Sequence, residues 1–448
     1  MAAGAGTDAA RAPITGRTAA EIAESIRDLR DRDALVPGDL LPPVRALAEQ
    51  LGVNRNTVVA AYGQLSRAGV VDAQGRAGTR IAGIVPVAQE GFAAQAELRD
   101  VASGNPDPAL IPDLAPLLRS ATGTPVLYGE PVVDAGLADW ARSWMRPDVP
   151  AEFTLTVTHG AADAVERLLS QSLQRDDAVA LEDPCFLASI HTVRVGGYRP
   201  VPVPVDEEGM TVDGLRDALD RGVRAIISTP RAQNPTGASR SAARAAALRE
   251  VLADHPYVLV IEDDYFSLLS REPFHPIVGP EHRRWALVRS LSKVIGPDIA
   301  VALVASDADT AAGLSVRLRP GTTWVSHLLQ RLAHGLLTDP DATARIARAR
   351  VHYAERNDAV ARILTDSGLP TAAGDGLSLW VGLPVPAQSV RRSLAARGWL
   401  VRAGDDFRVE DPDAVSSRLR ITAHALTDAE AARLAADLVA SVEEARQE

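Results

Sequence analysis

Lys293 is the residue in this sequence that most directly indicates chemistry. The chain contains 47 Lys and Arg residues, and every one of them except Lys293 is arginine. Arginine can replace lysine as a positive charge, but its guanidinium group cannot form a Schiff base with a carbonyl compound. Two interpretations follow: Lys293 is kept for covalent amine chemistry, or it is a surface residue left by chance.

Polar and aromatic residues near the ends of predicted strands could complete a site around this amine. Asp263 and Tyr265 follow the apolar run 257–262, at the carboxyl end of a parallel strand, where ligands gather. Asn234 occurs in the sequence Gln-Asn-Pro-Thr-Gly and Phe186 in Pro-Cys-Phe. Taken singly, each has an ordinary alternative as a helix cap, a plain turn or a core aromatic residue.

A junction that contains glycine is the predicted anion site. Residues 158–162, Thr-His-Gly-Ala-Ala, join a predicted strand to a predicted helix, and the free N–H groups of a helix N-terminus bind anions. Gly160 and Ala161 lie at that junction, and Ser290 lies three residues before Lys293. An amine, a carboxylate, donors to a ring oxygen, an aromatic face and a phosphate cup are together what pyridoxal phosphate requires from a protein.

Apolar runs and helical stretches alternate from Val101 onward. The predicted strands are 154–158, 178–182, 198–204, 223–228, 257–262, 286–289 and 299–305, and the helices between them include 162–174, 213–221 and 241–253. This alternation predicts an α/β domain over residues 101–448, with a mostly parallel sheet covered on both faces. Residues 83–100 show no sustained period and are interpreted as a linker.

Residues 14–82 predict a separate winged helix-turn-helix domain. The expected elements are helices over 21–32, 43–51 and 55–68 and a two-stranded wing made by 70–71 and 79–81. The third helix of such a domain enters the major groove, so Arg55, Asn56 and Thr57 at its start would meet bases and phosphates. Arg45 lies on the preceding helix. The alternative is a small helical domain used for dimerisation.

Composition excludes several other classes of protein. No apolar run approaches the ~20 residues of a membrane helix, and residues 1–13 show no secretion signal. Cys185 is the only cysteine, which excludes an internal disulfide or cysteine-based metal cluster and fits a reducing cytoplasm; no metal site is predicted. The net charge is −11, but residues 14–82 carry nine Arg against eight Asp or Glu, so the acidity lies elsewhere. DNA binding therefore remains compatible with the charge.

The N-terminal motifs resemble a known family of DNA-binding domains. Residues 38–48, 51–58, 61–62 and 65, followed by Gly78 and Thr79 in the wing, are similar to the GntR-type winged helix. This resemblance implies that Arg45, Arg55 and Thr57, together with Gly78 and Thr79, contact operator DNA.

The C-terminal motifs resemble, in their order, the fold-type I aminotransferases, and the whole chain is similar to the MocR-type members of the GntR regulators. The resemblance implies that Lys293 forms the internal aldimine with pyridoxal phosphate and that Asp263 pairs with the pyridine nitrogen. Tyr265 and Asn234 would hold the ring oxygen, and Phe186 would stack on the ring.

The same resemblance implies roles at the edges of the cofactor site. Gly160, Ala161 and Ser290 would hold the phosphate, and Tyr128 matches a tyrosine that reaches the phosphate from a neighbouring subunit of a homodimer. Arg420 would bind the carboxylate of an effector or substrate through two hydrogen bonds.

One position departs from the family pattern. The arginine that usually grips the phosphate, seven or eight residues after the lysine, is replaced by Ala300 and Val301, and the next basic residue is Arg317. A usual glycine is Asp298, and a usual glutamine of the cup is Ala162. Loss of a charge-assisted contact costs ~1.5–3 kcal/mol, so we expect weakened phosphate binding unless Arg317 or an arginine of another chain compensates.

The resulting hypothesis is a cytoplasmic transcription regulator. Its aminotransferase-like domain would bind pyridoxal phosphate, with an amino acid or amine as a further effector, and would thereby change the affinity of a homodimer for operator DNA. One alternative is an active pyridoxal-phosphate-dependent aminotransferase that carries a DNA-binding domain. A second is a repressor that keeps the aminotransferase fold only as a dimerisation scaffold.

Overall fold

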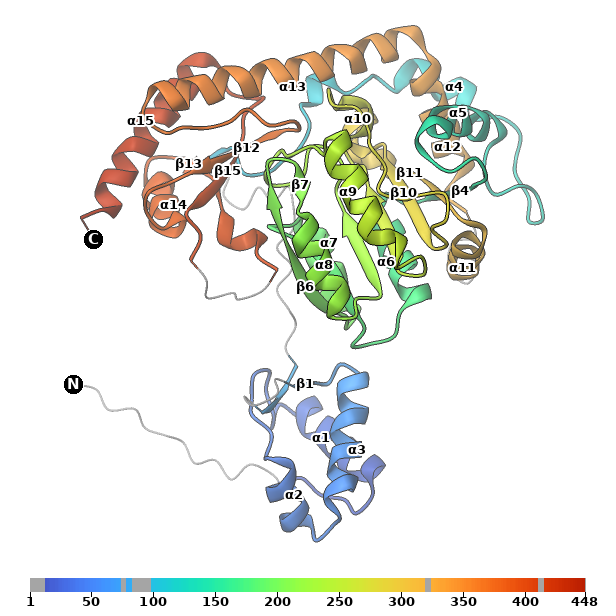
Figure 1. The fold of residues 1–448 in the computed structure, drawn as a ribbon, viewed down its shortest axis with the longest axis vertical. Coiled ribbons are helices and arrows are strands. Elements are labelled where there is room, and N and C mark those ends of the chain that lie inside the picture. The colour runs from blue at the N-terminus through green and yellow to red at the C-terminus, as the bar shows by residue number, and fades with distance from the viewer. Residues whose placement is uncertain (1–12, 74–77, 83–97, 319–323, 410–414, 448) are drawn as a thin grey trace. The chain divides into compact units, whose positions relative to one another are not determined.

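The computed structural model describes residues 13–73, 78–82, 98–318, 324–409 and 415–447 (Figure 1). The chain divides into two compact units, residues 1–87 and 88–448. In the N-terminal unit the elements are α1 (Ala19–Asp31), α2 (Val44–Leu51), α3 (Arg55–Arg67), β1 (Val71–Ala73) and β2 (Thr79–Ile81). The two strands pair antiparallel, as a wing requires.

Local signals explain where the helices of the N-terminal unit begin and end. Thr18 and Glu21 form a capping box at the start of α1, and Gly52 ends α2 in the left-handed conformation that glycine adopts without strain. The Asn54 side chain accepts a hydrogen bond from the Asn56 amide and so caps α3. Val58, Tyr62 and Leu65 of α3 pack inward, and the start of the helix stays on the surface.

The C-terminal unit is built on an eight-stranded sheet with the order β4-β11-β10-β9-β8-β5-β6-β7. Its strands are β4 (Thr154–Thr158), β5 (Ala178–Asp183), β6 (Arg199–Asp206), β7 (Gly209–Met210), β8 (Ala225–Ser228), β9 (Leu259–Asp263), β10 (Trp285–Ser290) and β11 (Ala302–Ser306). The strands β6, β5, β8, β9 and β10 are mutually parallel, and β11 is antiparallel to both of its neighbours. The predicted α/β fold with a mostly parallel sheet is confirmed.

Helices cover both faces of this sheet. They are α4 (Leu118–Ala121), α5 (Ala135–Met145), α6 (Ala161–Ser172), α7 (Leu187–Val195), α8 (Val212–Asp220), α9 (Ala242–Ala253), α10 (Ser292–Ile295), α11 (Ala308–Leu318), α12 (His327–Thr338) and α13 (Pro340–Asp366). Val179 and Leu181 of β5 pack with α6, α7 and α11, whereas Ala178 and Ala180 pack in the core shared with α5, α8, α9 and α12. Successive strand residues thus enter opposite cores, which explains the continuous apolar runs.

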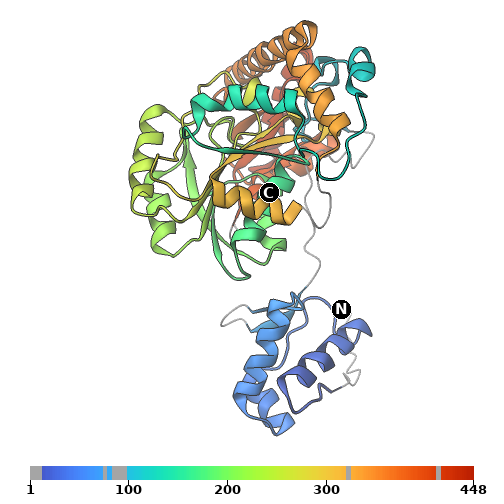
Figure 2. The same ribbon diagram turned by 90° about the vertical axis from the view of Figure 1, so that its right-hand side faces the viewer.

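A smaller subdomain completes the C-terminal unit. It contains β3 (Arg99–Asp100), β12 (Ser378–Gly382), α14 (Ala387–Ala396), β13 (Trp399–Leu400), β14 (Arg402–Ala403), β15 (Arg418–Thr422) and α15 (Asp428–Ala445). The two views in Figures 1 and 2 show α13 running along one end of the unit, from the helices beside the large sheet to this subdomain. The segment 99–100 returns to pair with β13, although it precedes the large sheet in sequence.

Candidate functional site

A cavity of about 320 Å³ lies where the carboxyl ends of the parallel strands meet the small subdomain. Of the residues predicted from sequence, those that line it are Lys293, Asp263, Tyr265, Asn234, Phe186, Gly160, Ala161 and Ser290. These residues come from five strand ends and their loops, so the sheet topology itself brings them together.

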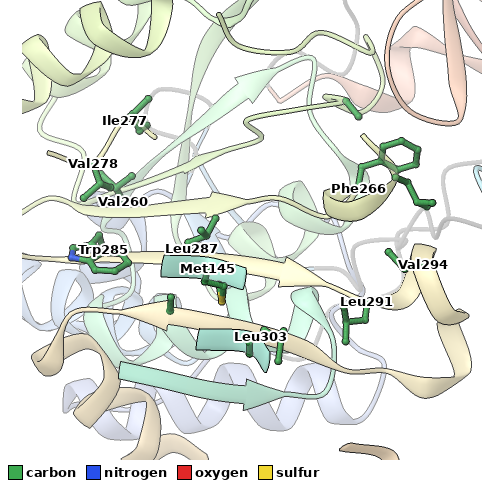
Figure 3. Packing of buried hydrophobic residues seen from close by; sticks show 14 of the residues in the cluster. Met145, Val260, Phe266, Ile277, Val278, Trp285, Leu287, Leu291, Val294 and Leu303 are labelled. Atoms are coloured by element: carbon green, nitrogen blue, oxygen red, sulfur yellow. The ribbon is translucent and has the colours of Figure 1, made fainter. Parts of the chain in front are cut away.

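Lys293 is positioned by a short turn after β10. The strand ends at Ser290, and Leu291 and Val294 on either side of Lys293 are buried in the core, as Figure 3 shows beyond the end of the strand. With its neighbours anchored, Lys293 extends toward the cavity, and its Nζ atom donates a hydrogen bond of 2.8 Å to the carbonyl oxygen of Gly104. The amine therefore belongs to the site and is not a chance surface residue.

Asp263 presents a buried carboxylate oxygen to the cavity. It is the last residue of β9, is 6% exposed, and its Oδ1 atom has no hydrogen-bond partner among the described residues. Burial, with the nearby carboxylates of Asp264 and Glu182, raises the pKa of Asp263 to about 7. A buried acceptor without a partner is costly, so this atom calls for a donor supplied by a ligand.

Three further side chains define the middle of the cavity. The Tyr265 hydroxyl donates to the carbonyl oxygen of Ala232 over 2.7 Å. The Asn234 Oδ1 atom accepts a hydrogen bond of 3.0 Å from Arg420. The ring of Phe186 lies nearly parallel to that of Tyr265, at 8° with centroids 6.4 Å apart. The two parallel rings and the polar groups of Tyr265 and Asn234 thus line the same cavity.

The start of α6, which the sequence predicts as an anion site, lines the cavity. Gly160 has φ +86° and caps the helix, and a Cβ atom added there would meet no atom within 4 Å. The amides of the first turn are therefore open to a ligand, next to Ser290 and Ser292. Among the described residues that line the cavity, the only basic side chains are Lys293 and His159.

The prediction that Arg317 could replace the missing phosphate-binding arginine is wrong for this chain. Arg317 donates a hydrogen bond of 2.6 Å to the carbonyl oxygen of Ser170 and is not among the residues that line the cavity. Ala300 does line the cavity, in a left-handed conformation with φ +46°. The predicted strand 299–305 is also wrong at its start, because residues 297–299 form a 3-10 turn and pairing begins at Ala302.

Two predicted residues lie outside the lining of the cavity. Arg420, on β15, is fully buried and donates to Asn234 and to the carbonyl oxygen of Ala102, so it reaches the cavity through Asn234. Tyr128 is 88% exposed, with its ring 5.4 Å from that of Trp324. Such exposure of a large aromatic residue is compatible with a role at another subunit.

Gly104 and the residues around the start of β12 were not among the predicted site residues. Gly104, Asp375, Leu377 and Ser378 line the cavity, and Gly104 accepts the hydrogen bond of Lys293. The turn-forming sequence Gly-Asn-Pro at residues 104–106 is a signal for an irregular segment, but its place beside Lys293 depends on contacts across 189 residues.

The start of α3 is the candidate DNA interface of the N-terminal unit. Arg45, Arg55 and Asn56 are exposed, and Thr57 is half-buried at the first turn of α3. In the wing, Thr79 begins β2. Gly78, just before it, has φ +93°, and a Cβ atom added to it would lie 2.8 Å from Cδ1 of Leu40. The glycine therefore sets the path of the wing. The Arg67 side chain and residues 74–77 lie outside the part of the chain that the structure describes.

The fold and the site define a winged helix-turn-helix domain joined to a domain of the aminotransferase class. Residues 18–81 match the model for bacterial regulatory proteins of the gntR family, and residues 94–438 match the model for aminotransferase class I and II. The chain belongs to the MocR-type subfamily of the GntR transcription regulators, which combines these two domains, and it is a DNA-binding regulator.

Similarity to individual proteins supports this family assignment. The chain is 47% identical, over 95% of its length and 98% of the relative, to a vitamin B6 salvage pathway transcriptional repressor of Salmonella typhimurium. It is 29% identical, over 86% of its length and 87% of the relative, to a pyridoxine biosynthesis transcriptional regulator of Corynebacterium glutamicum. A multiple substrate aminotransferase of Thermococcus profundus shares the fold, with a TM-score of 0.71 at 20% identity over 79% of this chain and 93% of that one. Among the described residues, no helix is long and apolar enough to cross a membrane.

Proposed function

We propose that pyridoxal phosphate, attached at Lys293, is the ligand to which this regulator responds. The observation that carries the proposal is the buried Oδ1 atom of Asp263, which has no partner among the described residues and lines the same cavity as the Lys293 amine. A protonated ring nitrogen is the donor that such a carboxylate would hold, and its positive charge would favour the ionised form of Asp263.

The remaining residues of the cavity fit the rest of this ligand. When bound, pyridoxal phosphate supplies an aldehyde that reacts with primary amines. Phe186 would lie against the ring, and the first turn of α6 with Ser290 would bind the phosphate. Asn234 would donate to the ring oxygen, and so would Tyr265 once its hydroxyl hydrogen turns from the Ala232 carbonyl oxygen to the ligand. For Asn234 this role uses its amide nitrogen, because its Oδ1 atom already accepts from Arg420.

The relatives support a role in vitamin B6 metabolism, and the fold supports a dimer. Both regulators described above are named for vitamin B6 pathways, so we infer that this chain controls genes of that metabolism and acts where the DNA is, in the cytoplasm. We propose a homodimer in which exposed Tyr128 contributes to the site of the other subunit. Arg420, beside Asn234, would bind the carboxylate of an amino acid effector.

An active aminotransferase is the second candidate, because the Arg420–Asn234 contact next to the Lys293 amine also suits an amino acid substrate. Repeated amino-group transfer between an amino acid and a keto acid, at more than one turnover per site, would support the enzyme. Binding of pyridoxal phosphate without turnover, together with a change in operator affinity, would support the sensor.

Replacing Arg55 with alanine tests the DNA-binding half of the proposal. We expect operator affinity to fall by about 10- to 100-fold, because a base or phosphate contact of a recognition-helix arginine is worth about 1–3 kcal/mol. The measurement is fluorescence anisotropy with an operator selected from fragmented genomic DNA, with and without pyridoxal phosphate. Arg32→Ala, at an exposed arginine that follows α1, is the matched control and should change affinity little.

The cofactor spectrum decides how the Arg55 result is interpreted. Arg55→Ala should bind pyridoxal phosphate as the wild type does, because the two units are separate. Loss of both DNA and cofactor binding in a folded variant would contradict the division of roles between the units, and wild-type operator affinity unaffected by pyridoxal phosphate would contradict the sensor.

Replacing Ala300 with arginine should strengthen cofactor binding. Ala300 lines the cavity, and a guanidinium group introduced there would contribute a charge-assisted phosphate contact of about 1.5–3 kcal/mol, or a roughly 10- to 100-fold lower Kd. A visible-absorption titration with pyridoxal phosphate measures it. Unphosphorylated pyridoxal and the uncharged variant Ala300→Gln are the controls, and an equal gain with either would show that the effect is not electrostatic.

A further inference from the structure

A short segment near the start of the C-terminal unit reaches the cavity at Gly104. Residues 99–107 are here called the strap. They begin with β3 and lie at the start of the described segment 98–318 of the C-terminal unit. At its start, the amides of Arg99 and Val101 donate to the carbonyl oxygens of Gly398 and Leu400 of the small subdomain. At its end, the amide of Asp107 donates to the Tyr353 hydroxyl over 3.1 Å.

The middle of the strap is held by Lys293, which lines the cavity, and by Arg420, which reaches the cavity through Asn234. Lys293 donates to the carbonyl oxygen of Gly104 over 2.8 Å, and Arg420 donates to that of Ala102. The Gly104 amide donates to the Thr422 hydroxyl over 3.0 Å. Gly104 itself lines the cavity, so the strap is both a wall of the site and a partner of its charged groups.

A ligand at these cations must change their hydrogen bonds to the strap. Condensation of the Lys293 amine with an aldehyde forms a C=N bond, and the aldehyde oxygen leaves as water with two hydrogens from the nitrogen. The three donors of the ammonium group become a single one, fixed in the plane of the C=N bond. A carboxylate bound by Arg420 would likewise compete with the carbonyl oxygen of Ala102.

We propose that the strap senses occupancy of the cavity: attachment of a carbonyl ligand at Lys293 releases residues 102–104, and this release passes to the residues that lead to the DNA-binding unit. The inference rests on the proposed function for the identity of the ligand, but its geometric part concerns only Lys293 and Gly104. A two-residue strand such as β3 is marginal alone. The ion pair of Arg99 with Glu430 anchors its start, and the contacts of residues 102–104 support its other end.

Removal of the Lys293 ammonium group without any ligand provides the test. Lys293→Met keeps a long unbranched side chain but has no donor, and hydrogen–deuterium exchange of the full-length protein is measured on peptides that cover the strap. We expect exchange of the strap amides to rise by about 10- to 100-fold, the value of one hydrogen bond to a charged group. Exchange of β9 should stay as in the wild type, which shows that the variant is folded.

Two matched variants separate this effect from general damage to the cavity. Lys293→Arg keeps charged donors and should keep the strap protected. Tyr265→Phe removes another side-chain hydrogen bond to a backbone carbonyl oxygen in the same cavity, 2.7 Å to that of Ala232, and should leave the strap unchanged. Wild-type exchange of the strap in Lys293→Met, or equal loosening in Tyr265→Phe, would overturn the proposal.

The ligand arm distinguishes failure of this inference from failure of the proposed function. We compare wild-type protein carrying attached pyridoxal phosphate with cofactor-free Lys293→Met. The two should show the same amide exchange of the strap and the same affinity for operator DNA. The inference is overturned if the wild type shows a visible cofactor band while the exchange of its strap amides is unchanged. It is also overturned if strap exchange rises in Lys293→Met while its operator affinity equals that of the cofactor-free wild type. If pyridoxal phosphate never attaches, the proposed function fails, while the exchange of Lys293→Met still decides whether Lys293 holds the strap.

Discussion

Replacing Lys293 with alanine is expected to abolish covalent attachment of pyridoxal phosphate. No other lysine exists in the chain, so the only other primary amine is at the N-terminus. Lys293 lines the cavity beside Asp263, whose carboxylate would hold the ring in reach of the amine. The wild type should therefore develop a visible absorption band with added cofactor, and Lys293→Ala should not.

Borohydride reduction and peptide mapping make this result specific. Reduction fixes the attached cofactor to its amine, and the labelled wild-type peptide should contain Lys293. Lys293→Arg is the matched control, because it keeps the positive charge but cannot form the C=N bond. A band that persists in both variants would place the attachment at the N-terminus. Absence of a band in the wild type at high cofactor concentration would favour the scaffold alternative.

Residues at strand ends were predictable because parallel topology brings such ends together. Asp263 ends β9 and Lys293 follows the neighbouring strand β10, and each strand begins as an apolar run in the sequence. The start of α6 follows β4, at the same end of the sheet. The alternation of strands and helices was therefore enough to predict that these groups share one site.

The contacts between distant segments could not be predicted in this way. Lys293 and Arg420 donate hydrogen bonds to the backbone carbonyl oxygens of Gly104 and Ala102, respectively. Every residue has such an oxygen, so the residue type gives no signal of these contacts. The left-handed conformation of Ala300 could not be predicted either, because residues 299–305 are all apolar and resemble one continuous strand. Only the structure shows the 3-10 turn before Ala302 and the later start of strand pairing. Tertiary context decides such positions.

A buried ion network behind the site was also absent from the sequence analysis. Asp264 is fully buried and lies 2.6 Å from Arg231 and 2.9 Å from Arg289. Arg289 is also 2.5 Å from Asp148, and its guanidinium carbon lies 4.5 Å from the centroid of the Trp144 ring. Each charge thus has an opposite partner within the network. The network fixes the residue next to Asp263 and hence the direction of β9 at the cavity.

Replacing Asp264 with asparagine should destabilise the C-terminal unit by about 3–5 kcal/mol, because the change leaves a buried arginine charge without compensation. The shape of the side chain is kept, so the loss reports charge and not a cavity. Denaturant unfolding of the full-length protein, analysed for the transition of the C-terminal unit, measures it. The midpoint should move to clearly lower denaturant concentration.

Asp213→Asn is the matched control for Asp264→Asn. The Arg216–Asp213 pair has the same 2.6 Å separation as Arg231–Asp264, but its side chains are 54% and 92% exposed. Solvent screens such a pair, so its loss should cost less than about 1 kcal/mol. Equal midpoints for the two variants would mean that burial of Asp264 adds nothing to stability. A large difference would show that the buried charge network stabilises the C-terminal unit.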